Sequence, residues 1–381
     1  VKLEEKERIQ LLMSASLAIF LVLAQFCTTS AFAPILLSHP EAAARARHCA
    51  FWSGGWGANT AEALMRRRGA RDERSRLLLM QAPGVAKLRR AENAPGNVFV
   101  DESCIDCGTC RWMSPCFTRS NDKSAVTVQP QSEEERLGAL QAMVACPTGS
   151  IRTESPDPLS KQATLSFPLP VPGLSNVYHL GYHSPKSYGA AAYLLVREGG
   201  NVLVDSPRFN EALAKGIIAL GGAKYMYMTH IDDVADHVRW SERLGCTRVM
   251  HASEAPRAGL SPGEGSVVLE GVGPWELDSG LRVIFQPGHT RGHTVLLDKE
   301  EGVLFTGDHL QKSSRLGFLA AFRRYCWHSW DDQIQSMEGL WKESGGFRAV
   351  LPGHGQRLLC TSEQEMEGHL KRCIEWMKEV A

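Results

Sequence analysis

The chain has 381 residues, of which 43% are hydrophobic and 22% are charged, a composition typical of a globular protein and not of a disordered one. The 42 basic and 42 acidic side chains cancel, so the charge balance gives no support for a nucleic-acid partner or an anionic membrane surface. Eleven cysteines are too few for a disulfide scaffold at this length, and we expect about two domains with extensions.

The N-terminal segment differs from the rest of the chain. Residues 16–25 form an almost unbroken apolar run, shorter than the ~20 residues of a membrane span, and small residues follow it. This pattern predicts a signal peptide over residues 1–31, and if Met13 is the true start, residues 1–12 are a gene-model artefact. Residues 32–80 are rich in Arg and Ala and poor in acids, which predicts a disordered transit peptide.

The string Ser-Ala-Phe-Ala-Pro at residues 30–34 resembles the junction of the bipartite plastid-targeting leaders of algae with complex plastids. This resemblance implies a mature protein in the stroma of the plastid (chloroplast), without a stable membrane span. The alternative is a plain secretory signal and a secreted protein. Cysteines without a pairing pattern favour the reducing stroma over an oxidising exterior.

Four cysteines have the spacing of a metal cage. Cys104, Cys107 and Cys110 are evenly spaced, and Cys146 follows far downstream, directly before Pro147. The first three place their thiolates on one tight loop and the remote cysteine adds a fourth, which is how a single four-iron cluster is held. The alternative, a zinc ribbon, usually has two separated Cys-x-x-Cys pairs. The spacing therefore predicts a 4Fe-4S cluster bound by these four cysteines.

The sequence around the cysteines supports this interpretation. Ser132 and Glu135 have the pattern of a capping box, which predicts a helix that ends just before Cys146 and delivers its thiolate. The strings CIDCGTC and ACPTGSI resemble those of single-cluster ferredoxins, and the resemblance implies a small α+β ferredoxin-like domain over residues 96–152. Five residues separate Cys116 from the preceding cysteine, where a two-cluster ferredoxin has three, so we interpret Cys116 as a non-ligand.

The second half of the chain alternates between strand-like and helical patterns. β-rich apolar runs bounded by turn signals predict strands, and helical patterns separate them. We expect helices at about residues 209–220, 233–244, 331–343 and 363–379. Strands interleaved with helices predict an α/β layered domain.

Metal-capable residues follow four of the predicted strands. The strings are Thr229-His230, Pro287-Gly288-His289-Thr290, Thr306-Gly307-Asp308 and Pro352-Gly353-His354-Gly355. Three of the four contain glycine, and side chains in such loops can converge at one rim of a sheet. Imidazole and carboxylate groups suit zinc, iron or manganese, so these strings together predict one shared metal site.

These strings resemble those of the metallo-β-lactamase superfamily, and the resemblance covers residues 164–381. It implies a four-layer αβ/βα sandwich with the metal site at one edge. It also implies that His289 binds a first metal, that Asp308 bridges two metals and that His354 binds the second. Two further histidines are interpreted as groups that orient a ligand or the substrate, namely His293 and His309.

The first motif departs from the family pattern His-x-His-x-Asp-His. Asp232 stands where the second histidine is usual, and a two-residue insertion would restore the Asp-His pair as Asp236 and His237. Helical spacing would place both on one helix face with Asp233. Alternatively, Asp232 or Asp233 caps the helix and Asp236 is solvated. The candidate metal ligands are His230, Asp232, Asp236, His237, His289, Asp308 and His354.

The leading hypothesis is a plastid iron–sulfur metallo-hydrolase, in which a metal-activated hydroxide attacks an ester, thioester or lactone. One or two zinc or iron ions would activate the hydroxide, with Asp308 as the bridging catalytic residue. Asp236 would be a proton shuttle if it is not a ligand. The alternatives are a redox enzyme with a non-haem iron site coupled to the cluster, and a non-catalytic redox or cluster-carrying protein. The expected partners are a small-molecule substrate and an electron-transfer partner, and nucleic acid is not expected.

Overall fold

The computed structural model describes residues 88–263 and 265–381. The expected signal peptide and transit peptide lie outside the described residues. Within the described part of the chain, no helix is both long enough and apolar enough to cross a membrane.

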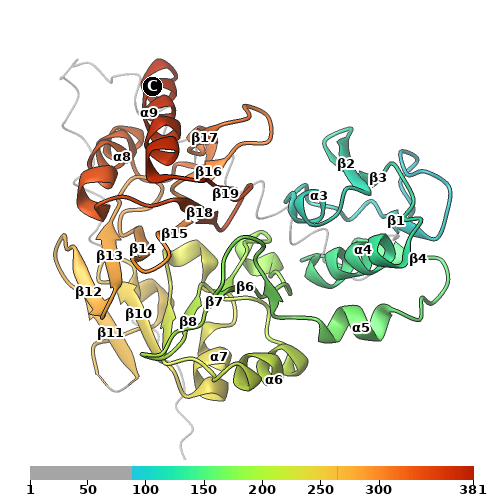
Figure 1. Ribbon diagram of the computed structural model, residues 1–381, viewed down its shortest axis with the longest axis horizontal. Coiled ribbons are helices and arrows are strands. Elements are labelled where there is room, and N and C mark those ends of the chain that lie inside the picture. The colour runs from blue at the N-terminus through green and yellow to red at the C-terminus, as the bar shows by residue number, and fades with distance from the viewer. Residues whose placement is uncertain (1–87, 264) are drawn as a thin grey trace, which may run out of the picture. The chain divides into compact units, whose positions relative to one another are not determined.

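One sheet has seven strands in the order β11-β10-β9-β8-β7-β6-β5 (Figure 1). The neighbours from β8 to β11 are parallel, and the pairs from β5 to β8 are antiparallel. Polar loops can therefore gather at the ends of the parallel strands. The strands are β5 (Leu169–Pro170), β6 (Val177–His179), β7 (Tyr193–Leu195), β8 (Val202–Val204), β9 (Tyr225–Tyr227), β10 (Thr247–His251) and β11 (Ser266–Leu269).

A second sheet has six strands in the order β12-β13-β14-β15-β18-β19. Strands β15 and β18 are parallel, and the other neighbours are antiparallel. The strands are β12 (Trp275–Asp278), β13 (Leu281–Phe285), β14 (Thr294–Asp298), β15 (Val303–Gly307), β18 (Ala349–Pro352) and β19 (Leu358–Leu359). A small pair, β16 (Gln311–Lys312) and β17 (Leu319–Ala320), lies between β15 and β18 in the chain.

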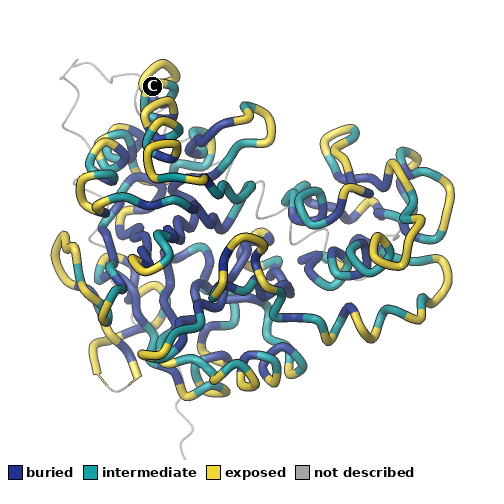
Figure 2. Tube along the Cα trace, viewed as in Figure 1, coloured by how far each residue is buried: buried dark blue, intermediate teal, exposed yellow. Residues whose placement is uncertain are grey.

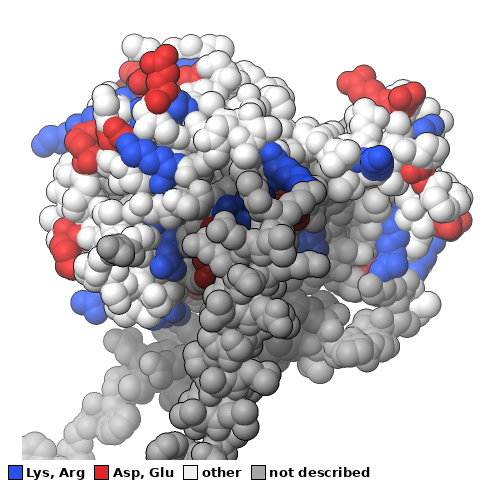
Figure 3. Space-filling view, turned by 90° about the horizontal axis from the view of Figure 1, so that it is seen from below, with Lys and Arg blue, Asp and Glu red and all other residues white. Residues whose placement is uncertain are grey.

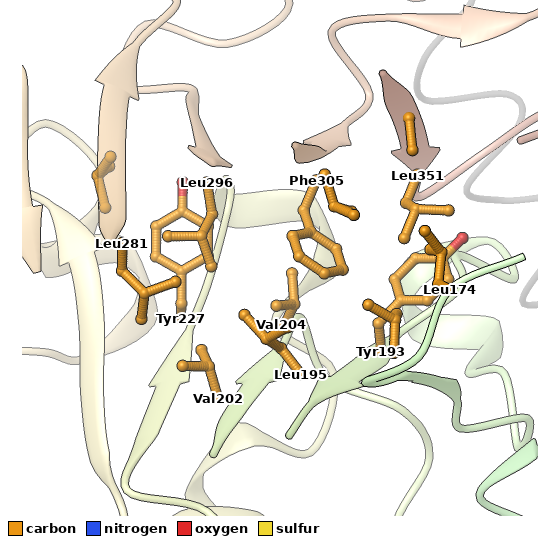
Figure 4. Close-up of a cluster of buried hydrophobic side chains, with 14 of the residues drawn as sticks. Leu174, Tyr193, Leu195, Val202, Val204, Tyr227, Leu281, Leu296, Phe305 and Leu351 are labelled. Atoms are coloured by element: carbon orange, nitrogen blue, oxygen red, sulfur yellow. The ribbon is translucent and has the colours of Figure 1, made fainter. Parts of the chain in front are cut away.

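The two sheets share one apolar core. Tyr193 and Val204 of the first sheet and Leu296, Phe305 and Leu351 of the second are buried in the same cluster, and Figure 4 shows the two sets pointing toward one another. Burying a side chain of this size contributes about 1.5–3 kcal/mol relative to leaving it exposed. This packing fixes how the two sheets face each other, and hence where the loops at their edge meet.

Helices cover the outer face of each sheet (Figure 1). Helices α6 and α7 pack on the seven-stranded sheet through residues such as Leu213 and Trp240, and α8 and α9 pack on the six-stranded sheet through residues such as Met337 and Leu370. The predicted four-layer αβ/βα sandwich is therefore confirmed. The helices are α5 (Ser160–Leu165), α6 (Glu211–Ala219), α7 (His237–Leu244), α8 (Trp330–Ser344) and α9 (Glu363–Glu379), with the 3-10 turns η1 (Pro185–Ser187), η2 (Ile231–Asp233), η3 (Ala255–Ala258) and η4 (Arg323–Tyr325).

The described residues before α5 form a small α+β unit with its own core. In its core, Val100, Phe117 and Ile151 pack with four of the cysteines. The Ser132 hydroxyl accepts the Glu135 N–H at 3.1 Å and the Glu135 carboxylate accepts the Ser132 N–H at 3.2 Å, which is the expected capping box. The elements are β1 (Val98–Val100), α3 (Thr109–Met113), β2 (Phe117–Ser120), β3 (Lys123–Val126), α4 (Glu133–Ala145) and β4 (Ile151–Thr153), with β1 paired to β4 and β2 to β3.

Charged side chains of the described residues are spread over the face of the molecule seen in Figure 3. Figure 2 shows that the strands of both sheets are mostly buried, while the exposed residues lie mainly on the outer helices and the loops. On the face seen in Figure 3, basic and acidic side chains of the described residues are interspersed, in keeping with 42 residues of each sign.

Candidate metal centre and cluster site

The four predicted cluster cysteines surround one cavity. Cys104, Cys107, Cys110 and Cys146 all line it, together with apolar residues that include Ile151. Burial, helped by the neighbouring Cys146 thiol, raises the pKa of Cys107 to about 12, and burial raises the pKa of Cys110 even further. Thiols packed this way would lose their protons to solvent only when their sulfur atoms bind a strongly positive group. The donor set therefore fits an iron–sulfur cluster.

The chain delivers these thiols from two directions. The loop that precedes α3 carries Cys104 and Cys107, and Cys110 lies in the first turn of that helix. Cys146 is the C-terminal cap of α4, and the Ser150 N–H donates to its Sγ at 3.3 Å. Cys116 is buried but does not line the cavity, which agrees with its interpretation as a non-ligand.

A second cluster of polar groups forms where loops of the C-terminal domain meet. His230 follows β9, His289 follows β13 and Asp308 follows β15. The Nε2 atoms of His230 and His289 lie 3.8 and 3.7 Å from Oδ2 of Asp308, and Nδ1 of His354 lies 2.7 Å from its Oδ1. Asp232 Oδ2 lies 3.9 Å from His289 Nε2. The structure thus brings five of the predicted ligands together.

Most ligand atoms of this centre fall into two overlapping groups that can each hold an ion, while His354 joins the centre through its contact with Asp308. The donor atoms of His230, Asp232 and His289 all lie within 4.8 Å of one another, and so do those of His230, Asp233 and Asp308. These two groups share His230, so the arrangement can hold one ion or two neighbouring ones. Imidazole and carboxylate donors suit zinc or iron.

Several buried atoms of the centre lack a partner. Nε2 of His230, His289 and His354, and both carboxylate oxygens of Asp233, make no hydrogen bond to any described residue. Burying such a group unpaired costs about 1–3 kcal/mol, and more when it is charged. One or two cations would satisfy the Nε2 lone pairs of His230 and His289 and the Asp233 carboxylate, and His354 Nε2 only in the neutral ring. Gly353 leaves the necessary room, because a Cβ there would lie 2.8 Å from Asp233 Oδ2.

Burial and mutual charge set the protonation of the centre. Burial alone would raise the pKa of Asp308, but the His354 imidazolium and its hydrogen bond outweigh burial and hold that pKa well below its usual range. Burial, with His230 nearby, lowers the pKa of His289 to about 4, so this ring is neutral and able to donate a lone pair. Burial and the Asp308 charge raise the pKa of Asp233 well above its usual range.

Two acidic residues of the centre were not among the predicted ligands. Asp233 is buried beside Asp308, and its sequence signals were the acid pair at residues 232–233 and the expected helix face shared with Asp236 and His237. Asp205, directly after β8, accepts the Thr229 N–H at 2.8 Å and lies 3.0 Å from Thr229 Oγ1. Thr229 Oγ1 in turn lies 2.9 Å from His230 Nδ1, so Asp205 orients a ligand through Thr229. The sequence signal that could have identified Asp205 is an acidic residue directly after a predicted strand.

The other histidines lie behind the ligands. The His293 ring lies 4.9 Å from that of His230 and 5.5 Å from that of His309. Burial lowers the pKa of both, to about 3 for His309, so both rings are neutral. Their ring nitrogens make no hydrogen bond to a described residue, so the orienting role of both histidines stays a prediction.

Two predicted ligands lie outside the cluster, and this corrects the expected first motif. The helix expected from residue 233 begins at His237, and Asp233 belongs to η2, so the shared helix face does not exist. The Asp236 carboxylate binds Lys186 Nζ at 2.7 Å and accepts the Phe209 N–H at 2.9 Å. Neither Asp236 nor His237 belongs to a metal-capable group in the part of the chain that the structure describes. Asp232 and Asp233 lie at the position in the centre where we expected Asp236 and His237.

A short segment, residues 184–189, contacts both centres, and we call it the bridging segment. A Cβ on Gly189 would lie 3.2 Å from Cys107 Sγ, and the Tyr188 hydroxyl donates to the Ile105 carbonyl at 3.0 Å. On the other side, the rings of Tyr188 and His354 lie 6.4 Å apart. The cluster loop and a metal-centre histidine therefore contact the same few residues.

Comparison with known proteins matches each part separately. Residues 100–153 match the family model described as the 4Fe-4S single cluster domain of Ferredoxin I, so this segment is a single-cluster ferredoxin domain. A stretch of 118 residues is 32% identical to a hydroxyacylglutathione hydrolase of Chelativorans sp. (strain BNC1), covering 29% of this chain and 44% of that protein. The chain thus spans less than half the length of the curated relative that it matches.

Similar solved structures are those of metallo-β-lactamases and of VMB-1. VMB-1 is 18% identical with a TM-score of 0.41, over 53% of this chain and 95% of that one. The DIM-1 metallo-β-lactamase is 15% identical with a TM-score of 0.42, over 55% and 95%. A metallo-β-lactamase from Hirschia baltica is 17% identical with a TM-score of 0.40, over 49% and 85%. The two facing sheets and their outer helices give the C-terminal domain a four-layer αβ/βα sandwich.

Proposed function

We propose that this protein is a metal-dependent hydrolase of small acyl substrates that also carries a 4Fe-4S cluster. The observation that carries the proposal is the convergence of His230, His289 and His354 on Asp308, with nitrogen–oxygen distances of 3.8, 3.7 and 2.7 Å. One or two zinc or iron ions bound there would lower the pKa of a bound water and polarise a carbonyl. Among esters, thioesters and lactones, the likeness to a hydroxyacylglutathione hydrolase favours an acyl-glutathione thioester.

The chain's own residues prepare this chemistry. Asp308 stays ionised and lies between the imidazoles, which suits a bridging carboxylate. Asp205 and Thr229 fix the His230 ring so that Nε2 presents its lone pair to the centre. Asp233 would hold a proton beside Asp308 in the metal-free protein, because burial and the Asp308 charge raise its pKa, and its carboxylate would be free to bind a metal once that proton is lost. Asp236, bound to Lys186, has no part in proton transfer in this proposal.

The test compares Asp308→Asn with Asp236→Asn in the full chain purified without oxygen. Metal content is measured together with hydrolysis of an acyl-glutathione thioester, an aryl ester and a lactone. Asp308→Asn should lose C-terminal metal and hydrolysis while keeping the iron–sulfur absorbance, and Asp236→Asn should keep both metal and hydrolysis. Loss of hydrolysis in Asp236→Asn with retention in Asp308→Asn would overturn the proposal.

A second candidate is a redox enzyme whose metal centre is a non-haem iron site coupled to the cluster. The bridging segment favours it, because Gly189 lies against Cys107 and Tyr188 lies beside His354. A pure hydrolase has no need for that proximity. This candidate would be supported if the C-terminal domain contains iron and a low-potential one-electron donor reduces that iron in unaltered protein. The same donor should not reduce it in the Cys146→Ser variant, which lacks the cluster. Zinc there, with hydrolysis unaffected by loss of the cluster, would rule it out.

We also propose that the protein works in a plastid, on the basis of the leader-like residues 1–80 and the cysteine cage. A fluorescent protein fused behind residues 1–80 should enter the plastid of an alga with complex plastids. Secretion of the fusion would favour the alternative of a plain secretory signal.

A further inference from the structure

Two buried histidines of the C-terminal domain form a hydrogen-bonded chain that ends at a cluster cysteine. His179 ends β6, and His183 follows it in the next loop. Their Nε2 atoms lie 2.8 Å apart, and His183 Nδ1 lies 3.1 Å from Thr109 Oγ1. Thr109 Oγ1 lies 3.5 Å from Cys107 Sγ. Neither histidine belongs to the metal centre or is among the predicted ligands.

The contacts of His183 determine where its proton lies. Its Nδ1 is 2.7 Å from the Gly189 carbonyl oxygen, which can only accept, so Nδ1 carries a hydrogen. Burial lowers the pKa of His183 to about 3, so the ring is neutral and its Nε2 accepts from His179 Nε2–H. The Nδ1 hydrogen is therefore directed at Gly189 O and at Thr109 Oγ1.

This arrangement leaves the Thr109 hydroxyl hydrogen for another acceptor. Thr109 Oγ1 already faces a donor, so its own hydrogen points either to Cys107 Sγ or to the Gly189 carbonyl, each at 3.5 Å. A free Cys107 thiol can donate to the hydroxyl, but a cluster-bound thiolate can only accept. Because hydrogen bonds to ionised acceptors are the stronger ones, the thiolate receives the hydroxyl hydrogen.

The histidine chain is held rigidly. The His179 ring packs edge-on against Trp112 with centroids 4.9 Å apart and against Phe167 at 5.9 Å. The Arg357 guanidinium lies 4.3 Å above the Trp112 ring. His179 and His183 are 2% and 1% exposed, so water does not compete for their ring nitrogens. Fixed donors of this kind orient the next group along a chain.

We propose that His183, supported by His179, is a positioning residue that aims the Thr109 hydroxyl at Cys107 Sγ and thereby raises the reduction potential of the 4Fe-4S cluster. Reduction adds negative charge to the cluster, and a hydrogen bond to a ligand sulfur stabilises that charge. The C-terminal domain thus sets the potential of a cluster held by the N-terminal domain. The inference rests on the cluster of the proposed function and is independent of the hydrolysis.

The test measures the midpoint potential of the cluster in the full chain by spectroelectrochemical titration. Thr109→Val removes the hydroxyl at nearly constant shape and should lower the equilibrium constant for reduction about tenfold, which is about 59 mV for one electron. Thr109→Ser keeps the hydroxyl and should restore the potential. His183→Phe should give a similar shift, whereas His183→Asn retains a donor near the Nδ1 position and should largely restore it.

Two further measurements separate tuning from a merely structural effect. In the double variant Thr109→Val with His183→Phe, the shift should equal that of Thr109→Val alone, because both act through one hydrogen bond. In unaltered protein, exchange into D₂O should shift the Fe–S(Cys) stretching bands. An unchanged potential in Thr109→Val with a full cluster, additive shifts in the double variant, or bands that do not respond to D₂O would each overturn the proposal. Hydrolysis unchanged in these variants leaves the hydrolase assignment intact, so the two proposals fail separately.

Discussion

The two centres of this protein are built in different ways. The cysteine cage takes three of its four thiols from residues 104–110 and the fourth from the end of one helix. The metal centre takes its ligands from loops after β9, β13, β15 and β18, which belong to two sheets. A local cage depends on chain spacing, whereas the metal centre depends on the packing of two sheets. The two should therefore respond differently to mutation.

The largest effect is expected in the cage. Cys146→Ser should abolish the broad visible absorbance of the cluster and its content of about four irons, because the fourth thiolate is lost. Cys116→Ser should leave both unchanged, since Cys116 does not line the cavity. Iron content and visible spectra of the two variants check this. A normal spectrum in Cys146→Ser would contradict the assignment of the fourth ligand.

The next largest effect tests whether the two centres load independently. His289→Ala should weaken metal binding in the C-terminal domain by more than about 100-fold, because it removes a ligand rather than an outer partner. The cluster spectrum should not change, since the cage uses other residues. His237→Ala serves as the matched control and should bind metal normally, because His237 lies outside the metal-capable groups of the described residues. Metal titration of cluster-loaded protein measures both.

A smaller effect is expected where the metal centre relies on distant support. Asp205→Asn should weaken metal binding about 10- to 100-fold, the usual effect of losing a partner that orients a ligand. The reason is that Asp205 holds Thr229, which holds the His230 ring. Asp278→Asn, which changes a partly exposed ion pair with Lys224, should have no effect on the binding of metal. If the Asp205→Asn variant and the unaltered protein bind metal with equal affinity, the orienting role of Asp205 is contradicted.

The last effect, a change in the stability of the domain, concerns the space around the metal. Gly353→Ala should destabilise the domain by about 1–3 kcal/mol and weaken metal binding, since its Cβ would lie 2.8 Å from Asp233 Oδ2 and 3.1 Å from Asp308 Oδ1. Gly368→Ala, at an exposed position within α9 where a Cβ meets nothing within 4 Å, should stabilise by up to about 1 kcal/mol. Thermal unfolding of both variants checks the difference. Similar melting temperatures would mean that the space beside Gly353 is not needed.

The fold and the cage were predictable because their signals are short-range. The capping box of Ser132 and Glu135 and the helix at residues 363–379 appear where the sequence placed them. The strand-end positions of His289, Asp308 and His354 were likewise readable. The ligands of the first motif were harder to predict, because Asp232, Asp233 and Asp236 are close in the sequence. The local backbone conformation decides which of these carboxylates faces the metal centre. The 3-10 turn η2 turns Asp233 inward, and Lys186 holds Asp236 away.

By itself the sequence determined which thiols form a cage and which strand ends carry metal-capable groups, because both follow from spacing along the chain. Only the tertiary structure decided that Asp205 and Asp233 belong to the metal centre and that His183 reaches Thr109. Those contacts join residues far apart in the chain: Asp205 and Thr229 are separated by 24 positions, and Thr109 and His183 by 74. Contacts over such separations depend on how sheets and domains pack, and no local pattern of residues records that packing.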